Sequence, residues 1–434
     1  MLGLLSAACA SVAFANLLFG LAIITKLGSI PIWRVYLLLP TVAALATMTV
    51  ILAAQRFPAL SGGGYPFVAA GSLLAAAVNG LSDDRIRIVV FGAAAGVTLG
   101  GLALAATAAP GLERLAIGAG LAAGVVANRA IVQLLPEHRP PYLRFVIAGG
   151  VAVLAAVLVA RRRAALAAAG NDAGNDAGRP FGATLAVAVA GGAVIAGLLL
   201  LSSDPPTSRM RYGLMGLAGI VALLMAWMAY RRAGAQGARW PLLGFALAGG
   251  LALICFPLQR PLTTTMAVIA TGGAVLGAAL AFAAPRLMPW EAFGVVAMAA
   301  GLLQTHAIEG PLLGIVNDRL VLGSGLVLGG AGFALGAGLV LAASLPSGAT
   351  GMAIGFVTLL LTAQAVGPVA DESMIPDDPN LSIAAAAAAL LIAGLFVVPP
   401  RPTDAPDTGP PMRREPDPGL AAAQTIGHQA TGAP

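Results

Sequence analysis

Charged, metal-binding and nucleophilic side chains are scarce in this sequence. Only 10% of its 434 residues are charged, three are histidine and two are cysteine. Cys9 and Cys255 both lie in apolar runs, so the sequence supports neither a disulfide framework nor a cysteine-based metal site. The histidines are far apart, and the sequence has no metal-ligand cluster, nucleophile elbow or phosphate-binding loop. We therefore expect no enzymatic activity, no metal and no cofactor.

Apolar residues dominate the composition instead. They make up 59% of the chain, and the mean hydropathy is +0.90. A typical globular domain is about 25% charged, so the charged fraction of this chain is unusually low. A soluble chain of this length cannot bury so much apolar surface. An apolar helix of about 20 residues can cross a bilayer, because its backbone hydrogen bonds are satisfied within the segment. The sequence predicts an all-helical (all-α) polytopic membrane protein.

About fourteen apolar runs are long enough to be transmembrane helices. They lie near residues 4–25, 33–55, 63–80, 87–109, 112–135, 143–160, 181–202, 211–230, 240–256, 264–284, 290–308, 320–343, 349–366 and 381–398. Glycines crowd the run at 320–343, which predicts close helix packing there, although a GC-rich genome would also explain the many Ala and Gly residues. The first run lacks a preceding basic segment, so we expect a retained helix and not a signal peptide.

Two polar stretches divide the chain. Residues 161–180 begin with three arginines and contain Asn-Asp-Ala-Gly twice, which is typical of a low-complexity linker. From about residue 399 the sequence turns to Pro, Asp, Arg and Gly, which predicts a disordered tail. We therefore expect an N-terminal helical bundle at 1–160, a linker at 161–180, a C-terminal helical part at 181–398 and a tail at 399–434.

The basic residues indicate a membrane orientation and not a nucleic-acid partner. The net charge is +6, yet the arginines stand in loops without interleaved aromatic residues. Loops after even-numbered predicted helices, together with the tail, hold 13 of the 24 Lys and Arg residues. The positive-inside rule then places both termini in the cytoplasm, for a multi-pass protein of the cytoplasmic membrane. The clusters at Arg161 and Arg231 favour this orientation most strongly.

The segment 79–88 reads Asn-Gly-Leu-Ser-Asp-Asp-Arg-Ile-Arg-Ile between two apolar runs. It resembles the loop that joins helices 2 and 3 in the major facilitator superfamily, in which Asp and Arg act as a charge latch during transport. The resemblance implies a conformational latch that is formed by Gly80, Asp83 or Asp84, Arg85 and Arg87. A short polar turn with a surface salt bridge is the alternative reading.

Further segments extend this resemblance along the chain. Arg114, Gly118 and Gly120 are similar to the motif in the fourth helix of that superfamily, and residues 136–140 to the turn that follows it. Residues 231–243 and 344–351 resemble loops of its fourteen-helix drug/proton antiporter branch. The glycine and proline motif of the antiporters' fifth helix is missing. Three predicted helices separate the 79–88 loop from the Arg161 cluster, so the two cannot both be cytoplasmic.

A few polar residues within apolar runs are candidates for a substrate or proton path. Arg129 is the deepest charge of the first half, and an arginine that snorkels to the interface is the alternative. His306 and Glu309 share a helix face and could titrate together, or the histidine is hydrogen-bonded at the membrane edge. Gln364 stands alone in an apolar run and either lines a path or bridges two helices. No acid lies at the middle of a predicted span.

Together these features predict about fourteen transmembrane helices in two pseudo-repeated, facilitator-like bundles around a central cavity. The expected function is secondary transport of a small organic molecule by alternating access, with efflux as the expected direction. The expected partners are that substrate and the lipid bilayer, and the sequence leaves a role for protons open. The alternative is a non-transporting membrane subunit or scaffold that kept the fold and lost the coupling chemistry.

Overall fold

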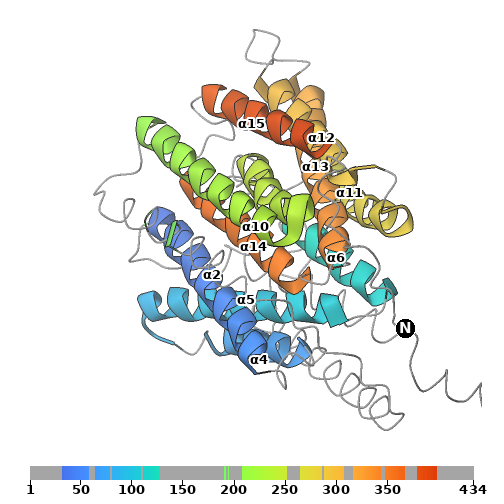
Figure 1. Cartoon of the computed structure of the whole chain (residues 1–434). Coiled ribbons are helices and arrows are strands. Elements are labelled where there is room, and N and C mark those ends of the chain that lie inside the picture. The colour runs from blue at the N-terminus through green and yellow to red at the C-terminus, as the bar shows by residue number, and fades with distance from the viewer. Residues whose placement is uncertain are drawn as a thin grey trace, which may run out of the picture. The chain divides into compact units, whose positions relative to one another are not determined.

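The computed structural model describes residues 32–57, 64–78, 81–108, 111–127, 190–191, 194, 208–251, 264–285, 288–306, 316–343, 348–366 and 379–397, and all their regular structure is helical (Figure 1). The chain divides into two units, residues 1–398 and 399–434. Every described residue belongs to the first unit. The predicted linker at 161–180, the predicted tail, both cysteines and the spans at 4–25 and 143–160 therefore lie outside the described residues.

The helices fall on the predicted apolar runs. They are α2 (Ile32–Arg56), α4 (Tyr65–Ala77), α5 (Asp84–Ala108), α6 (Gly111–Val126), α10 (Ser208–Gly250), α11 (Thr264–Ala283), α12 (Trp290–His306), α13 (Val316–Ala343), α14 (Gly348–Val366) and α15 (Pro379–Val397). Four segments of the described helices are long and apolar enough to cross a membrane, namely Arg85–Thr107, Tyr212–Arg231, Thr264–Ala283 and Gly323–Ala343. The all-helical membrane fold is confirmed for the described residues.

The element α10 is a helical hairpin. Gly234 has φ 65° and ψ −161°, a backbone conformation that is essentially restricted to glycine, and it interrupts the helix. A Cβ atom on Gly219 would lie 3.3 Å from Cζ of Phe245. A straight helix would hold these two residues about 39 Å apart. The chain therefore folds back at Gly234, and the two arms, 208–233 and 235–250, correspond to the separate spans predicted at 211–230 and 240–256.

Glycines bring the backbones of α11, α12 and α13 into contact. A Cβ atom on Gly330 of α13 would lie 2.5 Å from the backbone N of Met298 in α12. On the α11 side, a Cβ atom on Gly273 would meet the carbonyl oxygen of Gly329. Such close approach is how small residues strengthen helix packing in membranes. The close packing that the sequence predicts for the glycine-rich run is confirmed.

The helices before the predicted linker pack on one another and on helices that follow it. Thr47 of α2 donates hydrogen bonds to the carbonyl oxygens of Ala43, at 2.8 Å, and of Gly96 in α5, at 3.1 Å. The helices α2 and α5 also contact α14, and α6 contacts α11 and α13 (Figure 1). The first unit is therefore held together by contacts across the predicted linker.

Candidate functional site

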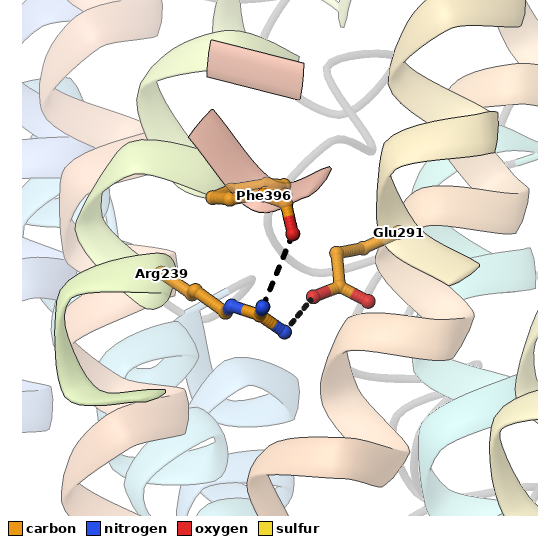
Figure 2. Close-up of polar contacts among 3 residues, drawn as sticks. All are labelled: Arg239, Glu291 and Phe396. Atoms are coloured by element: carbon orange, nitrogen blue, oxygen red, sulfur yellow. Dashed lines mark hydrogen bonds and ion pairs between the residues drawn. The ribbon is translucent and has the colours of Figure 1, made fainter. Parts of the chain in front are cut away.

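A single arginine joins three helices. Arg239 lies in the second arm of α10, and its Nη1 is 3.2 Å from Oε1 of Glu291 in the first turn of α12. Its Nη2 donates a hydrogen bond of 3.2 Å to the backbone carbonyl oxygen of Phe396, in the last turn of α15. Figure 2 shows the guanidinium between these two acceptors. We refer to Arg239, Glu291 and Phe396 as the Arg239 cluster.

Two helix ends supply favourable electrostatics to the cluster. Glu291 stands at the N-terminus of α12, where the helix dipole favours a negative charge. The Phe396 carbonyl is one of the last carbonyls of α15, which have no acceptor role within their own helix. The guanidinium therefore neutralises the Glu291 carboxylate and also donates a hydrogen bond to a carbonyl at the end of α15. It also lies 5.8 Å from the centroid of the Phe396 ring, within the range of a cation–π contact.

The two charges of the cluster differ in their access to water. The Glu291 side chain is 4% exposed and the Arg239 side chain 31%. The second carboxylate oxygen of Glu291, Oε2, is buried and has no hydrogen-bond partner among the described residues. A buried charge is costly unless it is paired. Glu291 therefore depends on Arg239 more strongly than Arg239 depends on Glu291.

A tryptophan precedes Glu291 and another follows Arg239, and each fixes its neighbour to a further element. Trp290 donates a hydrogen bond of 2.9 Å from Nε1 to the carbonyl oxygen of Ala284, just beyond the end of α11. The Trp240 ring packs on α14, where a Cβ atom on Gly355 would lie 3.0 Å from its Cε3. These contacts hold the backbones on both sides of the ion pair in place.

The acidic and basic residues of segment 79–88 lie at the start of a helix. Asp83 precedes α5, and its Oδ1 accepts hydrogen bonds from the backbone N–H groups of Arg85, at 2.8 Å, and Ile86, at 3.4 Å. This is the arrangement of an N-cap. The sequence predicted a loop here and a membrane span from about residue 87, but α5 begins at Asp84, so Asp84, Arg85 and Arg87 belong to the helix. Gly80 lies outside the described residues.

The helix α5 separates this segment from the Arg239 cluster. Asp83 stands at its start, and its end at Ala108 leads to Gly111, the first residue of α6. A Cβ atom on Gly111 would lie 3.0 Å from Cε2 of Phe282, in the last turn of α11, and Glu291 follows α11 closely in the sequence, in the first turn of α12. A helix of this length spans about 36 Å. The two charged sites therefore lie at opposite ends of the packed helices.

Of the remaining predicted site residues, those that the structure describes do not belong to the Arg239 cluster. Arg114, Gly118 and Gly120 lie in α6, and a Cβ atom on Gly118 would be 2.9 Å from Cγ2 of Val340 in α13. His306 is the last residue of α12, so it lies at the opposite end of that helix from Glu291. Gln364 lies near the end of α14. The His306 and Gln364 side chains, and all of Arg129 and Glu309, lie outside the described residues.

Sequence reasoning did not single out Glu291 or Arg239 as a pair. Glu291 is an acid in the first turn of an apolar run, and this is the one signal that could have marked it. Arg239 lies in the segment 231–243, which resembles a loop in the sequence. The two residues are 52 positions apart, and no spacing rule connects them across α11 and its flanking segments.

Comparisons with known proteins assign no activity to this chain. No protein-family model matches the chain, and no curated protein matches it. Solved structures similar to it include the human organic anion transporter MFSD10 (TETRAN), with 15% identity and a TM-score of 0.46 over 91% of this chain and 95% of that one. A double-tryptophan variant of XylE shows 11% identity and a TM-score of 0.47, with the same coverages of 91% and 95%. A variant of the peptide transporter POT in complex with alafosfalin shows 16% and 0.45, over 91% and 92%.

With TM-scores below 0.5, these structures assign neither an activity nor a substrate to this chain.

Proposed function

We propose that this chain is a secondary transporter of a small organic molecule and that the Arg239 cluster is the latch of its alternating access. The observation that carries the proposal is the ion pair of Arg239 and Glu291, which joins helix ends in a chain with few charges. Ionisable residues in membrane helices are costly and are usually retained for function. The facilitator-like motifs of the sequence support transport independently.

The geometry of the cluster suits a two-state element. One guanidinium holds the second arm of α10, the start of α12 and the end of α15. If its bonds break, the ends of these three helices lose their shared polar contact. The glycine-mediated contacts of α13 with α11 and α12, which begin one turn after Glu291 at Gly294, hold those three helices as a rigid group. Rigid groups of helices that rock about such contacts are the usual means of alternating access.

The substrate and the direction follow the sequence-based expectation of a small organic molecule that is exported from the cytoplasm. The two termini are proposed to be cytoplasmic, because the basic cluster at Arg231 then faces the cytoplasm. The Arg239 cluster, a few residues beyond it, would close the cytoplasmic end of the protein. The start of α5 with Asp83 would then face the other side of the membrane.

Efflux from cells tests this function. Cells that produce the full chain are loaded with fluorescent organic cations and anions, ethidium among them, and efflux is compared with cells that lack it. Arg239→Gln and Glu291→Gln should slow efflux of a transported dye at least tenfold at equal amounts of protein in the membrane. Arg56→Gln, at the exposed end of α2, is the matched control and should leave efflux unchanged. Equal efflux by wild type and both cluster variants would contradict the latch.

A non-transporting membrane scaffold is the second candidate. It is favoured by the packing of α11, α12 and α13, where Gly273, Gly294 and Gly330 fill the interfaces with backbone contacts. A scaffold would move none of the dyes. Its cluster variants would lose stability without any change in dye content of the cells.

A further inference from the structure

The first arm of α10 carries an exposed apolar stripe. Ile220 is 65% exposed, Leu223 60% and Trp227 51%, and Leu224 and Tyr230 are also exposed. Steps of three and four residues place them on one side of the helix. This segment, Tyr212–Arg231, is long and apolar enough to cross a membrane, and two thirds of it remain unburied by the rest of the chain. The stripe therefore faces the surroundings of the protein and not its core.

An arginine stacks on the aromatic end of the stripe. The guanidinium carbon of Arg231 lies 4.2 Å from the centroid of the Trp227 ring, one helical turn earlier. The Arg231 side chain thus runs back over the stripe. It does not extend past the hairpin turn into water. No carboxylate of the described residues pairs with Arg231. Arg239, on the other arm of the hairpin, is already engaged by Glu291, so the two arginines have separate roles.

The stripe has the dimensions of one lipid leaflet. From Ile220 to Arg231 the helix rises about 16 Å, and one leaflet contributes about 15 Å of hydrocarbon. Tryptophan and tyrosine are enriched where the hydrocarbon meets the headgroups, which is where Trp227 and Tyr230 stand in this scheme. Arg231 then lies at the level of the lipid phosphates. A guanidinium binds a phosphate through two parallel N–H donors.

We propose that Trp227, Tyr230, Arg231 and the stripe below them bind one anionic phospholipid of the surrounding leaflet. Arg231 holds its phosphate, the aromatic rings contact the glycerol region, and an acyl chain lies along Leu224, Leu223 and Ile220. The site prefers an anionic headgroup to a zwitterionic one because Arg231 carries a positive charge that no described carboxylate neutralises. This inference stands on α10 alone and holds whether or not the chain transports.

Quenching of tryptophan fluorescence by brominated lipids tests the site. The full chain is reconstituted in bilayers that mix unlabelled lipid with either brominated phosphatidylglycerol or brominated phosphatidylcholine. The Trp227 contribution is obtained as the difference between wild type and Trp227→Phe. Phosphatidylglycerol should quench this contribution with an apparent affinity about fivefold higher than phosphatidylcholine, the effect of one basic residue near the surface.

Variants and a competitor decide between the outcomes. Arg231→Gln should abolish the preference for phosphatidylglycerol, whereas Arg239→Gln should retain it. Equal quenching by the two lipids in the wild type would overturn the proposal, and so would a preference that survives in Arg231→Gln. Inorganic phosphate should not change the quenching, and displacement by it would overturn the assignment to a lipid.

Discussion

Arg239 and Glu291 are 52 positions apart in the sequence and form an ion pair of 3.2 Å in which only the arginine retains access to water. The exposed fractions of 31% and 4% make the pair asymmetric. Removal of one partner leaves the other charge alone, and the cost depends on whether that charge can be hydrated. The asymmetry leads to a quantitative prediction for the two single variants.

Arg239→Gln should lower the free energy of unfolding by about 3 kcal/mol, because it leaves the buried Glu291 carboxylate without its partner. Glu291→Gln should cost about 1 kcal/mol, because the exposed side of Arg239 can turn to water. The double variant should resemble Glu291→Gln alone. Chemical unfolding of the purified protein in detergent measures all three. Equal losses for the two single variants would show that the burial difference does not govern the pair.

Two neighbouring glycines of α11 should respond in opposite ways to alanine. A Cβ atom on Gly273 would meet the backbone of Gly329, so Gly273→Ala should cost about 2 kcal/mol through overpacking. Nothing lies within 4 Å of a Cβ atom on Gly272, so Gly272→Ala should gain up to about 1 kcal/mol of helix propensity. Thermal unfolding of the two variants side by side checks this. A loss for Gly272→Ala as large as that for Gly273→Ala would refute the packing of α11 on α13.

The hairpin of α10 should depend on glycine at position 234. Its φ of 65° with ψ of −161° is disfavoured for any residue with a Cβ atom, so Gly234→Ala should cost about 1 to 3 kcal/mol. Gly216→Ala is the control, because nothing lies within 4 Å of a Cβ atom there and the helix is regular. The unfolding midpoints of the two variants are compared. A Gly234→Ala variant as stable as the wild type would mean that the two arms do not turn back at this residue.

Asp83 should act as a helix cap. Asp83→Ala removes the acceptor of the Arg85 and Ile86 N–H groups and should cost about 1 kcal/mol. Asn caps as well as Asp, so Asp83→Asn should keep the stability of the wild type. Unfolding free energies separate the two variants. If Asp83→Asn keeps its stability and yet slows dye efflux, the carboxylate charge serves the latch that the sequence resemblance implies.

The apolar pattern predicted the helices well because a run of about twenty apolar residues in a membrane satisfies its own backbone hydrogen bonds only as a helix. Glycines at 329, 330 and 332 also predicted a tightly packed helix. The pattern could not predict the Arg239 cluster, because it depends on how α10, α12 and α15 meet, and no local spacing encodes that meeting. Likewise, the acids at 83 and 84 read as loop residues, since a cap and a loop share the same residue types.

Surface labelling of two cysteine variants tests the central claim that the Asp83 segment and the Arg239 cluster lie on opposite sides of the membrane. Ser82→Cys and Gln236→Cys, both at exposed positions, are made in a background in which Cys9 and Cys255 are replaced by serine. A membrane-impermeant maleimide should label the Ser82→Cys variant in intact cells and the Gln236→Cys variant only after permeabilisation. Labelling of both variants from the same side would contradict the account.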